Sequence, residues 1–391
     1  MDRRRFIRNV SLTMAAGMKM PGALGAPPPA LRYRRLGRTG LRVSEISLGG
    51  SPLPPEAVLR QALEYGVNYV DTSSSYMNGN SERLIGKILK GRRDRLIVAT
   101  KFHAGRPGTD RAALEKEFEG SLKRLDVDCV DILMIHGARS PDVIGDETVL
   151  RLFETFKKAG KIRFTGVSCH TRPLEVLPPA IRGGHFDVIN LAYNAFSGSS
   201  IRPDGIYDDY LRRSGIEGLI ELAHAHDVGV VAMKTMAGGD RQDLRAFREA
   251  GVGLATAKLK WVLSNPHVST AITEMTTFDM LEENLSASGS SLSAGERSAL
   301  AEHLVVRSRT SCGFCGQCAP VCEAGIAIPD IFRYVYHHSF QGKKTQAREE
   351  YARLAERERY EGCTDCRRCV SVCPNRLPIP RLLKIAHRVL A

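Results

Sequence analysis

Apolar residues form short runs from residue 41 onward, and these runs alternate about eight times with stretches of helical spacing. In the helical stretch 115–125, for example, Phe118, Leu122 and Leu125 fall on one face. Strands that alternate with helices over roughly 250 residues are typical of an α/β fold in which a parallel sheet closes into a (β/α)8 TIM barrel. The runs that we assign to strands are Glu45–Leu48, Val67–Asp71, Leu96–Lys101, Val130–His136, Phe164–Ser168, Val188–Tyr193, Val228–Lys234 and Thr270–Thr273.

Polar residues close three successive strand-like runs. Asp71 ends the first of them, and Tyr76 follows it by five residues. Lys101 ends the next run, and His136 ends the one after that. Each residue alone has a structural explanation, because an aspartate can cap a helix, a lysine can face solvent and a histidine can be satisfied in the core. The order of all four instead predicts a site at the C-terminal ends of the strands, where barrels of this kind carry their chemistry.

The order and spacing of Asp71, Tyr76, Lys101 and His136 resemble the catalytic tetrad of the aldo-keto reductases. The resemblance covers residues 31–286 and implies a barrel that uses NADPH or NADH without a Rossmann domain. The nearest glycine pattern, Gly251-Val252-Gly253, agrees with that implication, because it lacks a third glycine and does not follow a strand. Further blocks that look like those of the family are Tyr33–Gly40, Gly166–Ser168, Val188–Asn194, Met233–Gly239 and Trp261–Pro266.

The four side chains suit the reduction of a carbonyl group by hydride, which leaves an alkoxide that needs a proton. Tyr76 can give that proton, although a free phenol has a pKa of about 10. The ammonium group of Lys101 would stabilise the phenolate, and Asp71 would keep that ammonium charged and in place. His136 can donate a hydrogen bond to the substrate oxygen. The resemblance implies that Tyr76 is the general acid/base and that the substrate is a small carbonyl compound or alcohol.

Seven residues stand where the family holds its cofactor, and several of them depart from the usual pattern. By the resemblance, Ser168 and Cys169 would hold the nicotinamide carboxamide, although the family usually has asparagine at the second position. Asn190 replaces a glutamine, and Tyr193 would stack on the nicotinamide, with a core aromatic as the alternative. The other contacts that the resemblance implies are Lys234, Glu283 and Asn284.

The cofactor's 2′-phosphate site also departs from the pattern, because Glu274 and Met280 replace the usual basic residues. A carboxylate near a ribose favours the free hydroxyl over a phosphate. We therefore expect NAD(P)H as the cofactor, with a preference for NADH as a hypothesis.

Eight cysteines form two runs of identical spacing near the C-terminal end: Cys312, Cys315, Cys318 and Cys322, then Cys363, Cys366, Cys369 and Cys373. This spacing is used to ligate [4Fe–4S] clusters, so two runs predict two clusters. Zinc, which favours cysteine pairs, and disulfides are the alternatives. The pattern between the runs is helical from Ile328 to Arg359, which resembles helical two-cluster ferredoxins. Some aldo-keto reductases carry such a module, and this resemblance implies that the fourth cysteine of each run serves the other run's cluster.

The first 30 residues look like a targeting segment. Arg3-Arg4 and Phe6-Ile7-Arg8 resemble a twin-arginine signal, and a weakly apolar stretch follows them as far as Ala26. We therefore expect export of the folded protein to the periplasm. A merely basic tail on a cytoplasmic protein is the alternative.

The formal net charge of +13 lies mostly at the two ends of the 391-residue chain. Residues 1–40 hold nine basic residues and one acidic residue, and the segment from Arg307 onward holds fifteen basic and eight acidic residues. The intervening part is close to neutral, which argues against a nucleic-acid partner. No apolar run approaches the roughly 20 residues of a membrane span, so we expect none.

The chain thus divides into a signal arm (1–30), an aldo-keto reductase barrel (31–290) and a small α-helical ferredoxin-like two-cluster domain (291–391). We expect an NAD(P)H-dependent oxidoreductase that is electronically coupled to its two clusters and exchanges electrons with a redox partner protein. A hydride carries two electrons and each cluster takes one, so two clusters match one cofactor. The alternative is a catalytically idle barrel that scaffolds the ferredoxin-type module for such a partner.

Overall fold

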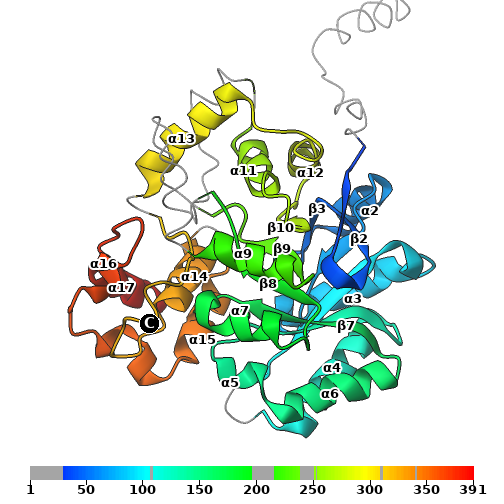
Figure 1. The fold of residues 1–391 in the computed structure, drawn as a ribbon, viewed down its shortest axis with the longest axis horizontal. Coiled ribbons are helices and arrows are strands. Elements are labelled where there is room, and N and C mark those ends of the chain that lie inside the picture. Colours follow the sequence, from blue (N-terminus) through cyan, green and yellow to red (C-terminus); the bar gives the residue numbers. More distant parts are fainter. Residues whose placement is uncertain are drawn as a thin grey trace, which may run out of the picture.

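The structure is a computed structural model that describes residues 30–105, 109–195, 215–237, 251, 253–308, 311–339 and 341–391. The expected signal arm, apart from Ala30, lies outside the described residues. Two parts are visible in Figure 1, a barrel ringed by helices and a smaller helical part built from the C-terminal residues.

Eight parallel strands form a closed barrel, because the last strand, β10, pairs with the first, β3. This confirms the predicted fold. All eight predicted runs are strands, and their ends agree to within two residues. The strands are β3 (Ile46–Gly49), β4 (Tyr69–Asp71), β5 (Ile97–Phe102), β6 (Val130–Ile135), β7 (Ile162–Cys169), β8 (Val188–Ala192), β9 (Gly229–Met233) and β10 (Thr270–Thr273).

A β-hairpin closes the N-terminal end of the barrel. Its strands, β1 (Tyr33–Arg35) and β2 (Arg42–Ser44), pair antiparallel around the short helix η1 (Gly37–Thr39). Leu36 and Val43 from this hairpin are fully buried among inward-facing strand residues such as Ile132 and Val231. Because this end is filled with apolar side chains, the opposite end is the one that remains open to a ligand.

Helices surround the barrel and bury its outer face, as the apolar spacing predicted. The larger hydrophobic core lies between these helices and the outward-facing strand residues. None of the helices in the described part of the chain is both long and apolar enough to cross a membrane. The helices are α2 (Glu56–Glu64), α3 (Asn80–Leu89), α4 (Arg111–Leu125), α5 (Pro141–Ile144), α6 (Glu147–Lys158), α7 (Pro173–Arg182), α9 (Ile216–Ala225), α11 (Leu254–Leu263), α12 (Phe278–Leu285) and α13 (Ala294–Ser308).

Helix α13 belongs to the barrel part, although the sequence placed it in the C-terminal domain. Ala299 and Leu300 are buried in the barrel's outer core, and Glu296 pairs with Lys260 of α11 over 2.6 Å. The first half of α13 therefore packs with the barrel, although it lies beyond the predicted boundary at residue 290.

The C-terminal part is a helical domain with its own apolar core. Its elements are α14 (Ile328–Ser339), α15 (Lys344–Ala352), η4 (Glu356–Glu358), η5 (Tyr360–Gly362), α16 (Arg368–Ser371) and α17 (Ile379–Leu390). Helix α14 packs against α15 and α17. The predicted helical stretch 328–359 is thus two helices, and the chain turns between them at Gly342, which has a φ of +68°.

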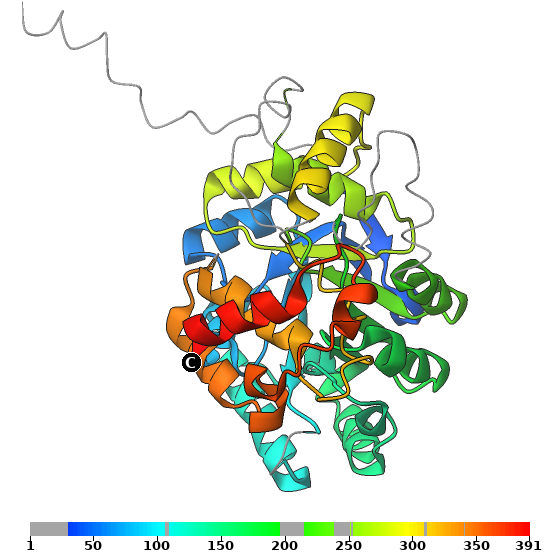
Figure 2. The ribbon, with the colours of Figure 1, turned by 90° about the vertical axis from the view of Figure 1, so that its left-hand side faces the viewer.

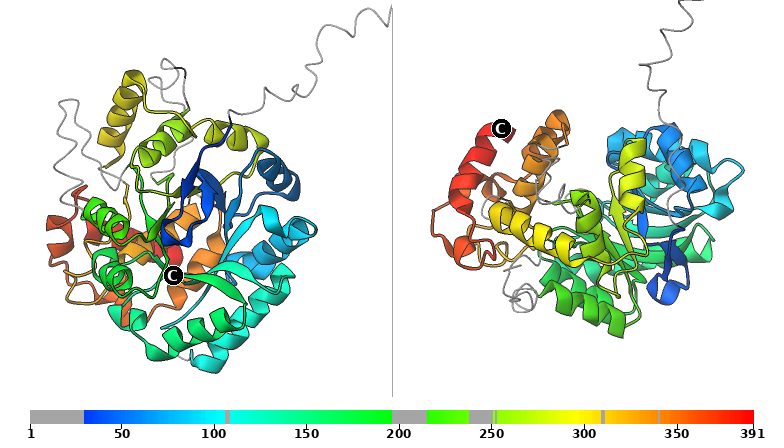
Figure 3. Two further views of the ribbon diagram at one scale, coloured as in Figure 1. Left: turned by 45° about the vertical axis from the view of Figure 1, so that its right-hand side comes forward. Right: turned by 90° about the horizontal axis from the view of Figure 1, so that it is seen from above.

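This domain covers the C-terminal ends of the barrel strands. Figure 2 shows α14, α15 and α17 in front of the barrel, and both views in Figure 3 place them at one end of it. Thr171, just after β7, donates a hydrogen bond to Asp330 of α14 over 2.9 Å. Ser51, just after β3, accepts one from Lys343 over 2.7 Å. The open end of the barrel and the cysteine-rich domain therefore share one interface.

Candidate active site

The four residues of the predicted tetrad lie at the C-terminal ends of three neighbouring strands. Asp71 is the last residue of β4, Lys101 lies near the end of β5, and His136 directly follows β6. Tyr76 begins the short helix η2 (Tyr76–Gly79) that follows β4. Because β4, β5 and β6 pair in parallel, their ends meet on one side of the barrel, and the structure brings all four side chains together.

Lys101 connects the carboxylate of the site to its phenol. Its ammonium group is completely buried and donates hydrogen bonds to Asp71 and, over 2.7 Å, to the carbonyl oxygen of Thr72. The same nitrogen lies 4.9 Å from the centroid of the Tyr76 ring. Asn190 donates to the second carboxylate oxygen of Asp71 over 3.0 Å, so both oxygens of this buried acid are hydrogen-bonded.

The charges of this group keep the lysine ionised and the tyrosine protonated. Burial alone would lower the pKa of Lys101, but the Asp71 carboxylate beside it raises that pKa above the usual value. Burial raises the pKa of Tyr76, and the charge of Lys101 opposes only part of that rise. The phenol is therefore protonated at neutral pH, and an ammonium group stands ready to stabilise the phenolate once the proton leaves.

His136 lies beside the phenol. The two rings meet edge to face, with centroids 5.5 Å apart and an interplanar angle of 84°. Nδ1 of His136 is 2.9 Å from Oγ of Ser73, which fixes the orientation of the imidazole. From this position the ring can donate a hydrogen bond to the oxygen that Tyr76 protonates.

A second imidazole, His103, lies next to His136, and the sequence analysis did not identify it. The two ring centroids are 4.6 Å apart, and Nδ1 of His103 is 2.6 Å from Oε1 of Glu117. His103 directly follows β5, so its place after a strand was the signal that could have found it.

Ser168 and Asn190 form a pair that suits a carboxamide. They are register partners on β7 and β8. Oγ of Ser168 and Oδ1 of Asn190 are both buried and have no hydrogen-bond partner among the described residues. A carboxamide offers a carbonyl acceptor and two N–H donors, which match a hydroxyl and an amide oxygen. The residues present therefore fit the nicotinamide end of NAD(P)H.

Tyr193 does not face this pair, so its predicted stacking on the nicotinamide is wrong. Its ring packs 5.0 Å from Trp261, centroid to centroid, and its hydroxyl donates to Glu217 of α9. Side chains along a strand alternate between the two faces, and Asn190 faces inward. Tyr193, three residues later, therefore faces the outer core, which agrees with the alternative that it is a core aromatic.

Cys169 is also turned away from the predicted carboxamide site. Its thiol lies 3.0 Å from the carbonyl oxygen of Thr171 and 3.4 Å from that of Ala138. It belongs to the barrel's outer core, whereas its neighbour Ser168 faces inward. Burial raises the pKa of this thiol, so it is a protonated core residue.

A cavity of about 1600 Å³ extends from the tetrad across the open end of the barrel. Single-ligand pockets in proteins are typically about 300–1,000 Å³, so this one has room for a cofactor and a substrate together. Four of the residues that the resemblance placed near the cofactor line it: Glu274 and Met280 from the 2′-phosphate position, and the further contacts Glu283 and Asn284. Asn284 is held by a hydrogen bond from its side chain to the carbonyl oxygen of Glu274, over 3.0 Å.

Lys234 lines the middle of the cavity, directly after β9. Its ammonium nitrogen is 3.3 Å from Nε2 of His337 in the C-terminal domain. Burial, followed by the nearby charges of Arg333 and Lys343, lowers the pKa of Lys234 to about 7. Lys234 has no carboxylate within ion-pair distance among the described residues, and a buried lysine of this kind fits a contact to the phosphates of a dinucleotide.

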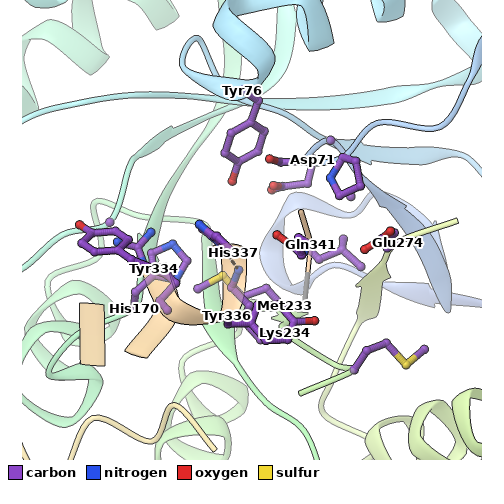
Figure 4. Close-up of a pocket in the computed structure, with 18 of the residues that line it drawn as sticks. Asp71, Tyr76, His170, Met233, Lys234, Glu274, Tyr334, Tyr336, His337 and Gln341 are labelled. Carbon is purple, nitrogen blue, oxygen red and sulfur yellow. Dashed lines mark hydrogen bonds between the residues drawn. The ribbon is translucent and has the colours of Figure 1, made fainter. Parts of the chain in front are cut away.

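The side of the cavity that faces Tyr76 is built by the C-terminal domain. Figure 4 shows Tyr334, Tyr336 and His337, all from α14, across the cavity from Tyr76. The residues of α14 carry no motif, so nothing in the sequence predicted a site role for them. The cysteine-rich domain thus contributes directly to the pocket in which the predicted chemistry takes place.

The eight cysteines of the two runs form two groups that exchange their fourth members. Cys312, Cys315, Cys318 and Cys373 surround one small cavity. In the other group, burial and then the charges of Cys322, Cys366 and Cys363 raise the pKa of Cys369 to about 11. No disulfide joins any of the ten cysteines, so the disulfide alternative is wrong. The two sets of four cysteines match the ligand number of two iron–sulfur clusters.

Comparison with known families gives two matches along the chain. The profile of the aldo/keto reductase family matches residues 55–249, and that of a 4Fe-4S dicluster domain matches residues 304–374. The second match selects iron–sulfur clusters over zinc.

Individual proteins agree with the first of these matches. The chain is 30% identical over 299 residues to L-galactose dehydrogenase of Arabidopsis thaliana, covering 66% of this chain and 88% of that protein. It is 27% identical over 315 residues to an uncharacterized oxidoreductase of Bacillus subtilis, covering 70% of this chain and 96% of that protein. Among solved structures, an aldo-keto reductase from Klebsiella pneumoniae in complex with NADPH matches with a TM-score of 0.56 and 25% identity, over 70% of this chain and 95% of that one.

Proposed function

Because this chain belongs to the aldo/keto reductase family and is an NAD(P)-dependent oxidoreductase, we propose that it reduces a carbonyl compound, or oxidises an alcohol, with Tyr76 as general acid/base. The observation that carries the proposal is the buried contact between Lys101 and Asp71, with the ammonium group 4.9 Å from the Tyr76 ring. A desolvated lysine that is paired with a carboxylate and lies beside a phenol at a cavity is typical of a functional site.

The chain's own residues would hold the reactants and move one proton. Ser168 and Asn190 would orient the carboxamide of the nicotinamide, which supplies or accepts the hydride when it is bound. His136 would hold the substrate oxygen next to the Tyr76 hydroxyl. As the oxygen gains negative charge, Tyr76 would give it a proton, and Lys101 would stabilise the resulting phenolate.

We further propose that the barrel is electronically coupled to the clusters, through the group that contains Cys312. The inner face of β8 supports this route, because it runs from Asn190 to Ala192, which lies in the core of the C-terminal domain. Two residues later, the side chain of Asn194 donates to the carbonyl oxygen of Gly313 over 3.4 Å. Gly313 is bonded directly to Cys312, so a short chain of bonded groups links the nicotinamide pair to this cysteine group.

The protein isolated anaerobically with its clusters tests both proposals. We expect it to oxidise NADPH or NADH in the presence of simple aldehydes. In the absence of an aldehyde, we expect the nicotinamide to change the electron paramagnetic resonance spectrum of the clusters. Cluster redox chemistry without any nicotinamide binding would instead support the idle-barrel alternative, which the outward positions of Cys169 and Tyr193 favour.

Export and a redox partner protein remain proposals. Export rests on the twin-arginine-like residues Arg3-Arg4 and Phe6-Ile7-Arg8 alone. The partner is inferred from the cysteine groups, which would pass electrons on one at a time.

A further inference from the structure

Arg333 of α14 is a largely buried guanidinium in the side of the cavity that the C-terminal domain contributes. Its side chain is 16% exposed. One terminal nitrogen donates to Oδ1 of Asp330 over 2.8 Å. Nε is buried and has no hydrogen-bond partner among the described residues. A buried donor without an acceptor is unfavourable, so in a cavity it indicates a ligand that brings the acceptor.

The carboxylate that holds Arg333 is shared with other groups. Oδ2 of Asp330 accepts hydrogen bonds from Arg139 over 2.7 Å and from Thr171 over 2.9 Å. Arg139 in turn lies 3.6 Å from Glu358. Within the described residues, Asp330 is the only carboxylate within 4.0 Å of Arg333. Arg333 is therefore oriented by Asp330 on one side and lacks an acceptor on the other.

The other charged and titratable groups near Arg333 neither pair with it nor add a full positive charge beside it. Glu350 of α15 is held by Gln346, over 2.9 Å, and lies 3.6 Å from His337. Burial lowers the pKa of His337 to about 3 and the pKa of His170 well below its usual value, so both imidazoles are neutral. Arg139 is already paired with Asp330, and Lys234, with a pKa of about 7, carries only part of a positive charge at neutral pH. A ligand with one negative charge therefore suits this environment better than a phosphate dianion.

Arg333 lines the same cavity as three residues of the tetrad, Asp71, Tyr76 and His136. Tyr334 and His337, which follow Arg333 on α14 by one and four residues, lie across the cavity from Tyr76 in Figure 4. The charge of Arg333 also reaches the phenol, because it favours the ionised form of Tyr76 and so opposes the rise in its pKa. Tyr76 and the guanidinium of Arg333 are therefore both available to ligands in this one cavity.

We propose that the substrate is a carbonyl compound that also carries a carboxylate, and that Arg333 binds this carboxylate through its Nε edge. The proposal rests on the carbonyl chemistry proposed at Tyr76 and adds the class of substrate. Because Arg333 belongs to the cysteine-rich domain, that domain then has a role in substrate selection in addition to holding clusters.

Steady-state kinetics with two matched aldehydes tests the proposal. We expect the wild-type protein with its iron–sulfur clusters to have a kcat/KM for 4-carboxybenzaldehyde roughly ten- to a hundred-fold higher than for 4-methylbenzaldehyde. This ratio corresponds to the free energy that a hydrogen bond to a charged group usually contributes. Arg333→Met should remove this preference, and Arg333→Lys should keep part of it. Arg348→Met, which changes an exposed arginine on α15, should keep the wild-type ratio. An equal ratio in wild type and Arg333→Met would overturn the proposal.

Binding of unreactive analogues separates this proposal from the proposed reaction. We expect calorimetry to show that 4-methylbenzoate binds wild type about tenfold or more tighter than 4-methylbenzamide, and Arg333→Met should lose the difference. The iron content and thermal stability of Arg333→Met would show that this variant is folded. If neutral aldehydes react but the two analogues bind equally, the carboxylate site is wrong and the reductase stands. If no aldehyde reacts but the benzoate still binds through Arg333, the reaction is wrong and the anion site stands.

Discussion

Lys101 approaches Tyr76 to 4.9 Å, measured from its nitrogen to the centroid of the ring, while its hydrogen bonds go to Asp71 and Thr72. The lysine is therefore held from the strand side and presents its charge to the phenol. Such an arrangement stabilises the phenolate more than the phenol, and a difference of that kind is what proton transfer in a transition state requires.

Tyr76→Phe removes the proton donor and leaves the pocket nearly unchanged in shape. We expect kcat/KM for aldehyde reduction to fall by about 10²–10⁴-fold, the usual range for general acid–base catalysis. Fluorescence titration should show that NAD(P)H still binds. Tyr65→Phe, which changes a tyrosine at the end of α2 away from the cavity, is the matched control. A Tyr76→Phe protein with wild-type activity would exclude this residue as the acid.

Asp71→Asn leaves the buried ammonium of Lys101 without its carboxylate. Removing one partner of a buried ion pair typically costs about 3–5 kcal/mol, so we expect a large drop in melting temperature and loss of activity. The double change Asp71→Asn with Lys101→Met removes the unpaired charge, and we expect it to regain stability but not activity. A double variant that melts below Asp71→Asn would show that the cost does not arise from the isolated charge.

The sequence was sufficient to predict the barrel and the tetrad, because both depend on local patterns. Apolar runs mark strands, and a polar residue at the end of such a run lies where parallel strands meet. Asp71, Lys101 and His136 satisfy this rule, and His103 satisfies it as well, although it was overlooked. The two cysteine runs were equally direct, because their spacing is itself the signal.

The predicted cofactor contacts of Cys169 and Tyr193 were wrong for one physical reason, which is the alternation of side chains along a strand. Ser168 and Asn190 face inward, so Cys169 and Tyr193, at odd separations from them, face outward. Both residues stand at positions that contact the cofactor in the family, but the two-residue period of a strand decides which face a side chain points to. Counting from Asn190 would have placed Tyr193 in the outer core.

The part that sequence could not predict is the contact between the two domains. Arg333, Tyr334 and His337 are ordinary residues of an amphipathic helix, and nothing local indicates that they face a barrel. Their position follows from the docking of α14 through Asp330, whose partners Arg139 and Thr171 are about 160–190 residues earlier. Such long-range pairs leave no periodic trace in a single sequence.

The lowered pKa of Lys234, about 7, predicts a pH-dependent stability of the cofactor-free protein. An unfolded lysine titrates near about 10.4. Between these two values the unfolded chain binds a proton that the folded chain does not, so the free energy of unfolding should rise as pH increases from about 7 to about 10. In Lys234→Met this rise should be smaller, and the protein should melt higher at pH 7. Thermal unfolding at several pH values tests this, with the exposed Lys90→Met as control.

Glu274 and Met280 predict how the cofactor is selected. Both line the cavity where basic residues would otherwise meet a 2′-phosphate. We expect wild type to bind NADH at least as tightly as NADPH in a fluorescence titration. Glu274→Gln combined with Met280→Arg should shift the ratio toward NADPH by roughly tenfold, because it removes one like charge and adds a guanidinium. Met280→Leu should leave the ratio unchanged. Much tighter binding of NADPH by the wild type would refute the preference.

The exchange of fourth cysteines predicts that two double variants with the same number of lost thiols will differ in iron content. Cys312 and Cys373 belong to one group in the structure, so Cys312→Ala with Cys373→Ala should damage one cluster and leave about half of the iron and sulfide. Cys312 and Cys322 share a run but belong to different groups, so Cys312→Ala with Cys322→Ala should damage both clusters and leave less. Each variant serves as the control for the other, since both lack two ligands. If each run instead ligated its own cluster, the two results would be reversed, because Cys312 and Cys322 would then share a cluster and Cys312 and Cys373 would not.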